Sequence, residues 1–496
     1  MRPPIISVAQ IQADHCFVAS NNCLHCHTDD NFLSDLLAGK LYRYLSVVRS
    51  RTQRNSELKK LLLLAACIGA GSAVAETANV NTGSSMGTGP SSNIYSLQSA
   101  ASNPAMNSLV VSEDHAWRFS YFPSFGVSAE LGDVENFSDD LDELIDIIDD
   151  ASATQDSVSD VLDRFNNTLQ AAGESGYIKG TVGFGLPLPR FVHRSDKFGA
   201  SFGVSASVQR QVSLSLLDSA LSFDEQNGTF ATATSLYLKS GIEKSVAFSY
   251  SKPLLSVKNN RLLGEPKLYA GLTAKIISLE LSKQVSPLQQ LEGRNISSVL
   301  EDEYDSNLNE STQLGLDAGV VWDAGKYRLG LTLQNINSPS FDYGDIGTDC
   351  ESREENSASR SSCEAARLFI QQRGEIQAGE THRMSARTRV DGLYHFNPKW
   401  FASASLDLAR YNDIVGFENQ WLHVATAYQF NNNILPSLRV GLQKNLAGEK
   451  LASLTMGMNL FKYVSLDMEY GLESTSFDDT STPRRFGIAL GVEEKF

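Results

Sequence analysis

The chain has 496 residues, 20% of them charged, and a formal net charge of −16 at pH 7. A chain this acidic is not built to neutralise phosphates, which excludes nucleic-acid binding over the whole surface, although a local basic lumen stays open. Hydrophobic residues are 42% of the chain and mean hydropathy is −0.20, yet no run of about 18 apolar residues follows the leader region, which excludes a helical membrane protein.

The first element has the layout of a secretory signal peptide. A basic doublet precedes the apolar run 61–68, and small residues then lead to Ala75, which precedes Glu76. This pattern predicts a signal peptide over 58–75, with cleavage between Ala75 and Glu76.

Residues 1–57 make the leader far longer than a signal peptide needs. We expect either a start codon assigned too early, with Leu58 read from an alternative initiator, or an extended leader. Cys67 follows a lipobox-like run, so a lipoprotein is a weaker alternative.

After the leader, residues 76–102 are rich in Ser, Thr, Asn and Gly without periodicity, which predicts a flexible segment. A large barrel domain over 103–496 then begins with Asn103-Pro104-Ala105. The aromatic alternating run 116–122 is suited to a first strand.

In the insertion 134–170 the spacing of the apolar residues changes from that of a strand to that of a helix. Apolar residues recur there at helical spacing in two stretches, which predicts two short amphipathic helices. Their other faces are strongly acidic, and we interpret them as solvated faces in preference to a cation or partner site.

From Tyr177 onward the sequence repeats strands of period two. The clearest runs are 198–208 and the hairpin 314–333, in which apolar residues alternate with small or polar ones. Such segments, joined by tight turns and long polar loops, are typical of an antiparallel transmembrane β-barrel, although a soluble β-sandwich would also alternate. We predict an all-β barrel of about 14 strands, within the range 12 to 16.

Three features favour the membrane. The leader exports the chain, aromatic residues lie near strand ends, and the last strand ends on Phe496, like the C-terminal signal of outer-membrane proteins. We therefore predict the cell outer membrane as the location, with membrane lipid and the barrel-assembly machinery as partners.

The six cysteines divide at the cleavage site. Cys350 and Cys363 are the pair that survives in the exported chain, within a polar stretch that has the composition of an exposed loop. An even pair in an exported protein predicts one disulfide, with two free thiols as the alternative.

The sharpest chemical motif lies before the signal peptide. Cys23-Leu24-His25-Cys26-His27 has the form that attaches c-type haem, and Cys16 could add a zinc ligand. Both interpretations are rejected, because this segment would not reach the compartment where that haem is attached. The exported part has no H-E-x-x-H, G-x-S-x-G or phosphate-binding glycine motif, so we expect neither an enzyme nor a cofactor.

Several segments resemble the TraF-type conjugal transfer family of outer-membrane proteins. The residues that carry the resemblance are Asn103-Pro104-Ala105, Trp117-Arg118-Phe119, 122–127, 139–144 and 330–336 with Pro339. The Asn-Pro-Ala start is also similar to that of long-chain fatty-acid transporters, which are 14-stranded barrels with an N-terminal plug. The resemblance implies a plugged barrel, with Asn103, Pro104 and Ala105 as a plug-like motif.

Three functions remain open at this stage. The first is a structural or accessory role in conjugal plasmid transfer, with conjugation-apparatus proteins as partners and no direct contact with nucleic acid. The second is a transporter of small hydrophobic ligands, and the third is a passive porin. A filled lumen would favour the first, an apolar lumen sealed by 103–111 the second, and an open charged lumen the third.

Overall fold

The structure is a computed structural model, which describes residues 84–111, 115–120, 122–134, 143, 147, 157–185, 191–226, 228–256, 266–290, 304–461, 463–477 and 480–492. The chain divides into two units, 1–59 and 60–496, and every described residue belongs to the second. The predicted signal peptide with Ala75 and Glu76, the upstream cysteines, most of the first predicted helix, and Phe496 lie outside the described residues.

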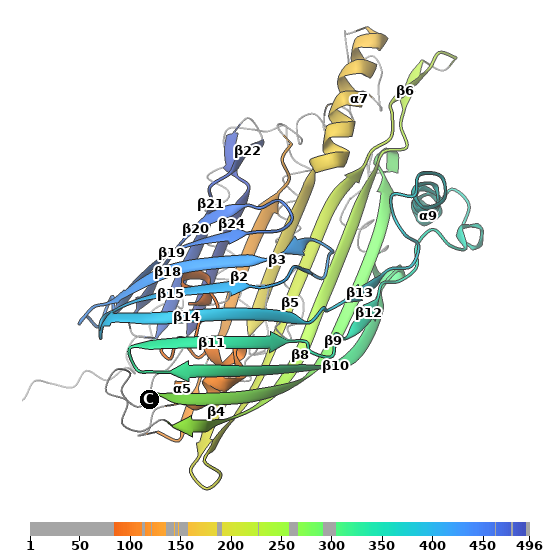
Figure 1. Ribbon diagram of the computed structural model, residues 1–496. Helices are drawn as coiled ribbons and strands as arrows, with labels where there is room; N and C mark the ends of the chain where they lie inside the picture. The colour runs from red at the N-terminus through yellow and green to blue at the C-terminus, as the bar shows by residue number, and fades with distance from the viewer. Residues whose placement is uncertain are drawn as a thin grey trace, which may run out of the picture. The chain divides into compact units, whose positions relative to one another are not determined.

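Fourteen antiparallel strands form a closed ring (Figure 1), and this confirms the predicted barrel. The ring closes because β8 pairs with β9 on one side and with β5 on the other. In ring order the strands are β5 (Ala200–Leu217), β3 (Tyr177–Gly185), β2 (Phe122–Leu131), β24 (Arg485–Val492), β21 (Val464–Gly471), β20 (Ala452–Leu460), β19 (Ser437–Asn445), β18 (Trp421–Gln429), β15 (Trp400–Asp407), β14 (Arg387–Asn397), β11 (Tyr327–Gln334), β10 (Asn309–Asp323), β9 (Lys267–Pro287) and β8 (Ser235–Ser256).

Shorter strands extend or decorate this ring. β4 (Phe191–Ser195) continues along β5 beyond β3, and β1 (Trp117–Phe119) pairs with β4. Four two-stranded hairpins lie in the connections: β6 (Ser222–Asp224) with β7 (Thr229–Ala231), β12 (Ser340–Asp342) with β13 (Thr381–Arg383), β16 (Tyr411–Asn412) with β17 (Glu418–Asn419), and β22 (Ser474–Phe477) with β23 (Thr480–Pro483).

The helices are short, apart from α7 (Val158–Ser175) and α9 (Ala358–Leu368). The others are α3 (Ser85–Thr88), α4 (Ser99–Ser102), η3 (Pro104–Met106), α5 (Asn107–Val110), η5 (Leu288–Gln290), η6 (Cys350–Ser352) and η7 (Phe369–Arg373). In the described part of the chain, no helix has the length and apolar character needed to cross a membrane. α7 is the second of the two predicted helices, and it buries Val161, Phe165, Leu169 and Ala172 along one face.

The two faces of the ring differ, as period-two alternation requires. The register aligns one row of outward residues across seven strands, and all but the first are apolar: Thr426, Val440, Met456, Met468, Ile488, Val127 and Val182. Val440, Met456 and Met468 are each 46% exposed although they are apolar. A continuous exposed apolar face around a closed sheet is the lipid-facing surface of an outer-membrane barrel.

The two ends of the barrel also differ. The β10–β11 and β20–β21 turns lie at one end, the short-turn end, and connections such as 335–386 lie at the other, the long-loop end. Short turns face the periplasm in bacterial barrels, so the long-loop end faces the cell exterior. β5, β8 and β9 have 18, 22 and 21 residues, and Figure 1 shows them rising toward α7 at the long-loop end.

A charge in the outward row should destabilise the barrel in lipid. Arginine in place of a lipid-facing residue at the bilayer midplane costs about 2–4 kcal/mol. We therefore expect Val440→Arg to lower the free energy of unfolding in vesicles by about that amount, while Val440→Leu leaves it nearly unchanged. Loss of the heat-modifiable, fast-migrating gel band over a urea series measures the effect; equal stability of both variants would contradict a lipid-facing Val440.

Candidate functional site: a lumen closed from both ends

Residues 84–111 lie inside the barrel, and we call this segment the plug. α3 contacts β18 to β21, whereas η3 contacts β8, β9 and β10, so the plug reaches different parts of the wall. An apolar cluster joins plug and wall residues: Leu97, Ala100, Ala105, Met106, Val110, Val111, Val192, Tyr269 and Val321. The structure therefore differs from the predicted flexible segment over 84–102, because small polar residues of that stretch pack against a polar wall.

The Asn103-Pro104-Ala105 motif fixes the plug to the wall. The Asn103 side-chain oxygen accepts a hydrogen bond from the Ala105 N–H at 3.0 Å, which caps η3, and Pro104 opens that helix. The Asn103 amide nitrogen donates to the backbone oxygens of Val320 at 3.2 Å and Leu331 at 3.4 Å. One side chain thus caps a plug helix and binds β10 and β11.

Two glycines form the wall beneath this motif, and we call them the glycine seat. Gly271 of β9 and Gly319 of β10 are directly paired across the strands. A Cβ at Gly319 would lie 2.0 Å from Asn103 Oδ1, and a Cβ at Gly271 would lie 2.4 Å from the carbonyl carbon of Pro104. Any other residue at either position would displace the plug or the strand.

Polar contacts hold the rest of the plug. Asn107 donates to the Pro104 oxygen at 2.8 Å and to Ser249 Oγ at 2.9 Å, and the hydroxyls of Ser108 and Ser251 are 2.6 Å apart. Arg118 is buried, and its guanidinium donates to the backbone oxygens of Ile94, Tyr95 and Val110 at 2.7, 2.9 and 3.0 Å. The plug is therefore bonded to strands on several sides.

The inner wall carries buried charges in opposite-sign groups. Asp407 accepts from Arg387 at 2.8 Å and from Arg389 at 2.9 Å, and Asp467 accepts from Arg439 at 2.8 Å. Glu130 lies 3.1 Å from Lys179 and 2.5 Å from Arg485, which also contacts Glu469, and Lys275 lies 3.0 Å from Asp317. A buried charge is tolerated when it is paired and hydrogen-bonded, so these groups fill the lumen as a bonded network.

A second segment enters the lumen from the long-loop end. Residues 408–420, the inner loop, carry β16 and β17, and Tyr411, Asp413, Ile414 and Val415 are all buried. Asp413 lies 3.7 Å from Lys179 of β3, and the Ile414 N–H donates to Gln211 of β5 at 3.2 Å. The loop connects β15 to β18 but bonds to the opposite part of the ring.

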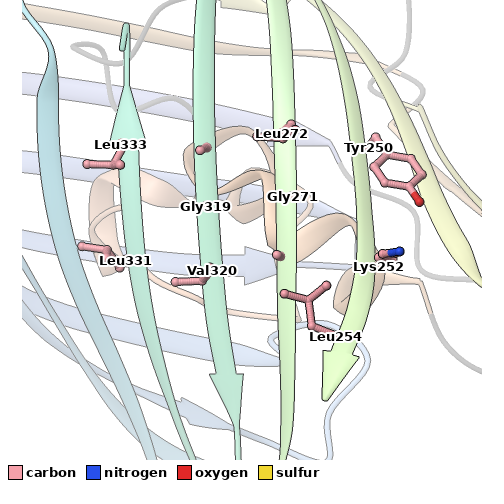
Figure 2. Close-up of a pocket in the computed structure, with 11 residues that line it drawn as sticks. Tyr250, Lys252, Leu254, Gly271, Leu272, Gly319, Val320, Leu331 and Leu333 are labelled. Atoms are coloured by element: carbon pink, nitrogen blue, oxygen red, sulfur yellow. The ribbon is translucent and has the colours of Figure 1, made fainter. Parts of the chain in front are cut away.

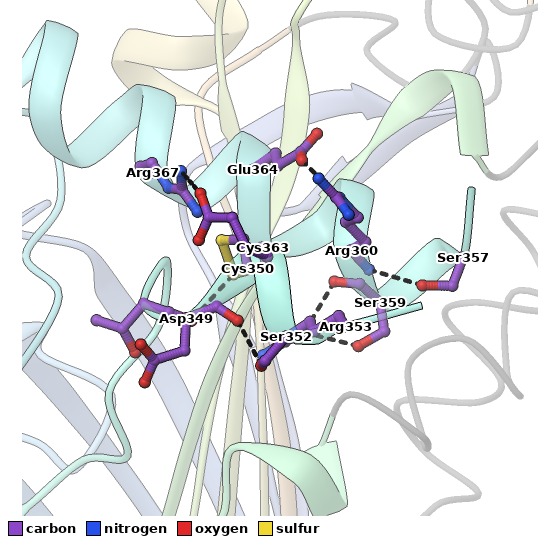
Figure 3. Close-up of a disulfide and its surroundings, with 12 residues drawn as sticks. Asp349, Cys350, Ser352, Arg353, Ser357, Ser359, Arg360, Cys363, Glu364 and Arg367 are labelled. Atoms are coloured by element: carbon purple, nitrogen blue, oxygen red, sulfur yellow. Dashed lines mark hydrogen bonds and ion pairs between the residues drawn. A yellow bond between two sulfur atoms is a disulfide. The ribbon is translucent and has the colours of Figure 1, made fainter. Parts of the chain in front are cut away.

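A cap covers part of the long-loop end. It comprises residues 340–383, which the β12–β13 hairpin closes at its base, and it includes α9. Cys350 and Cys363 form a disulfide with Cα atoms 5.5 Å apart, and Figure 3 shows it beside the ion pair Arg360–Glu364. Arg367 of the same helix forms a further ion pair with Glu351. Phe369, Ile346 and Ala366 of the cap pack on Leu217 and Val285 of the wall, which ties the cap to the rising strands.

A cleft lies between the plug and the wall near the short-turn end. Its volume is about 470 Å³, and its lining combines aromatic and amide side chains: Tyr95, Phe401 and Phe430 with Asn431, Asn432 and Asn433. Tyr95 stacks on Phe401 with ring centroids 6.2 Å apart. The cleft is the space beside the plug that could accept a small amphipathic molecule.

The structure brings some of the predicted site residues together. Asn103, Pro104 and Ala105 lie in the lumen, and Cys350 and Cys363 are bonded to each other in the cap. Within the described residues, no group of three or more His, Cys, Asp or Glu side chains could hold a metal ion. Sequence reasoning missed the glycine seat and the inner loop; glycines at inward positions of adjacent strands were the available signal for the seat.

Comparisons with known proteins identify a family for the chain. The family model described as F plasmid transfer operon, TraF, protein matches residues 100–407. Solved structures similar to the chain include a Pseudomonas aeruginosa FadL homologue, 12% identical, covering 84% of this chain and 99% of that one with a TM-score of 0.36. The Pseudomonas putida toluene transporter TodX is also 12% identical, with coverages of 85% and 99% and a TM-score of 0.38. No curated protein matches the sequence.

Enlarging the glycine seat should displace the plug. Ala105 is fully buried, so a cysteine placed there reports plug position through its reaction with a maleimide. We expect Ala105→Cys alone to be protected and Ala105→Cys with Gly319→Ala to be labelled, because the new Cβ overlaps Asn103. Ala105→Cys with Gly180→Ala is the matched control, since a Cβ at Gly180 meets nothing within 4 Å. Equal protection of the cysteine in all three proteins would refute the seat.

Acid should loosen the cap through His382, which lies in β13. Burial, with Lys239 adding to it and Glu380 opposing it, lowers the pKa of His382 to about 4. The folded cap binds the neutral imidazole, whereas the unfolded chain takes up a proton at a pKa of about 6.5. The free energy of unfolding of the cap is therefore highest above pH 6.5, and it falls by about 1.4 kcal/mol per pH unit as the pH drops toward 4.

Hydrogen exchange of the cap relative to the barrel strands, at pH 7 and pH 5, measures this effect. After correction for the slower intrinsic exchange of amides at lower pH, we expect weaker protection of the cap at pH 5 in the wild type and little change in protection in His382→Gln. An identical acid response in the variant would assign the effect to another group.

Proposed function

Because the chain belongs to the family of F plasmid transfer operon TraF proteins, we propose that it serves conjugal plasmid transfer as a closed outer-membrane barrel. Its role in this proposal is structural or accessory and non-catalytic, and its partners are other proteins of the transfer apparatus. Those partners bind surfaces outside the lumen.

The observation that carries the proposal is the occupation of the lumen by the protein's own chain. The plug is bonded to β8, β10 and β11 through Asn103, Asn107 and Ser108, and the inner loop bonds to β3 and β5 from the other end. The polar wall between them is neutralised by ion pairs. A barrel filled in this way supports a structural role better than it supports conduction, which speaks against the passive porin.

Transport of small hydrophobic molecules is the second candidate. The cleft lined by Tyr95, Phe401 and Phe430 favours it, because aromatic side chains bind apolar ligands and the cleft adjoins the plug. The charged inner wall disfavours it, since an apolar molecule that crossed the lumen would have to pass Asp407, Asp467 and their arginines. Transport along this route would also require the plug to move.

The experiment separates the two candidates by locking the plug. Ser108→Cys with Ser251→Cys replaces two hydroxyls that lie 2.6 Å apart, one in the plug and one in β8. Oxidation should crosslink the pair, with each single variant as the control. We expect deletion of the gene to reduce plasmid transfer between cells strongly, and the locked protein to restore transfer to the wild-type frequency.

Other outcomes would reject one or both candidates. Normal transfer in the deletion strain would reject the role in conjugation. Restoration by the reduced double variant but not by the oxidised one would show that plug movement is needed, which favours transport. Purified wild-type protein in a planar bilayer should also stay closed, and a steady open conductance would contradict the filled lumen.

A further inference from the structure

The outward face of the barrel carries an apolar groove over β8, β9, β10 and β11 (Figure 2). Its volume is about 360 Å³, and its lining is almost entirely hydrocarbon. Tyr250 and Leu254 border it on β8, and Leu331 and Leu333 border it on β11. In Figure 2 the plug is visible behind the same strands. Gly271 and Gly319 line the groove from their outer side, so the groove lies on the lipid side of the wall that holds the plug on its inner side.

Small side chains create the hollow. Ala318 lies between Leu272 and Leu333 in one cross-strand row, and Ala270 lies beside Val320 in the next. The larger residues on both sides stand higher than these alanines, so the sheet surface is recessed between them. A flexible acyl chain fills such a recess better than a rigid molecule does.

A single positive charge lies at one end of the groove. Lys252 is exposed and points outward between Tyr250 and Leu254, and its neighbour across the strands is Ala270. Among the described residues, none forms an ion pair or a hydrogen bond with Lys252. The described part of the groove therefore offers an ammonium group beside an apolar surface.

The position of Lys252 matches the level of lipid headgroups. On the outward face of β8, Val246, Phe248 and Tyr250 lie between Lys244, which pairs with Glu280, and Lys252. These two lysines are eight residues apart, which is about 27 Å along a strand. A strand tilt of about 35–45° shortens this to about 19–22 Å across the membrane, and the long lysine side chains reach the rest of the way out of the apolar band of about 25 Å. Lys244 thus lies near the boundary at the long-loop end. Lys252 lies near the boundary at the short-turn end, with the exposed Leu254 and Leu255 following it on β8.

We propose that this groove holds one anionic phospholipid of the leaflet at the short-turn end. An acyl chain lies over Ala270 and Ala318, and the phosphate is bound by Lys252. Anionic headgroups are selected because the basic side chain at the rim has no acidic partner among the described residues of the outward face. This inference concerns the outer wall and is independent of the role in plasmid transfer.

Native mass spectrometry of the detergent-purified protein tests the proposal, with phosphatidylglycerol and phosphatidylcholine as probes. We expect the wild type to retain one phosphatidylglycerol and little phosphatidylcholine. Lys252→Gln should lower retention several-fold by removing the charge, and Ala318→Phe should do so by filling the recess. Heat-modifiable gel mobility verifies that each variant has folded.

Matched controls make the same changes elsewhere on the outward surface. Lys444→Gln removes an exposed lysine of β19, and Ala404→Phe enlarges an exposed alanine of β15. Both should retain lipid like the wild type. Equal retention of the two lipids by the wild type, or equal loss in the control variants, would overturn the proposal. A dimer that Ala318→Phe abolishes would also overturn it, because the groove would then be covered by a second copy.

Discussion

Backbone N–H and C=O groups in the hydrocarbon of a membrane need partners within the protein, and a sheet meets this requirement when its first and last strands pair. Here the β5–β8 ladder, seventeen residue pairs long, closes the ring. Closure dictates that each strand turns alternate residues to lipid and to the lumen. Because the outward positions are apolar, the sequence places its polar and charged residues inward, and the composition of the lumen follows from the closure of the sheet.

Inward charges create a second constraint, since a lone charge in a confined lumen is costly and a hydrogen-bonded pair is tolerated. Asp407 between Arg387 and Arg389, and Glu130 between Lys179 and Arg485, meet this constraint across neighbouring strands. Polar side chains of the plug form hydrogen bonds with hydroxyl groups of the wall, as Asn107 does with Ser249 and Ser108 with Ser251. The plug and wall are thus complementary in shape at the glycine seat and in hydrogen bonding around it.

The period-two pattern was sufficient to predict the barrel and its strand number, because lipid contact imposes the same alternation on every strand. The plug over 84–102 was not predictable, since Ser, Asn and Gly have no periodicity and its order comes from contacts distant in sequence, such as that between Ser92 and Asp391. The inner loop was missed for the same reason. Asp413 and Ile414 are unremarkable in a loop sequence, and their partners Lys179 and Gln211 lie more than 200 residues earlier.

Strand length separates the part of the barrel that spans the membrane from the part that carries the cap. The stretch of β8 between Lys244 and Lys252 lies in the apolar band. Toward the long-loop end, β8 extends beyond Lys244 as far as Ser235, and β5 and β9 pair with this extension. The cap packs on this extension through Val285 and Leu217, and the disulfide holds its fold. The extension thus supports the cap outside the apolar band and leaves the lipid-facing part of the ring unchanged.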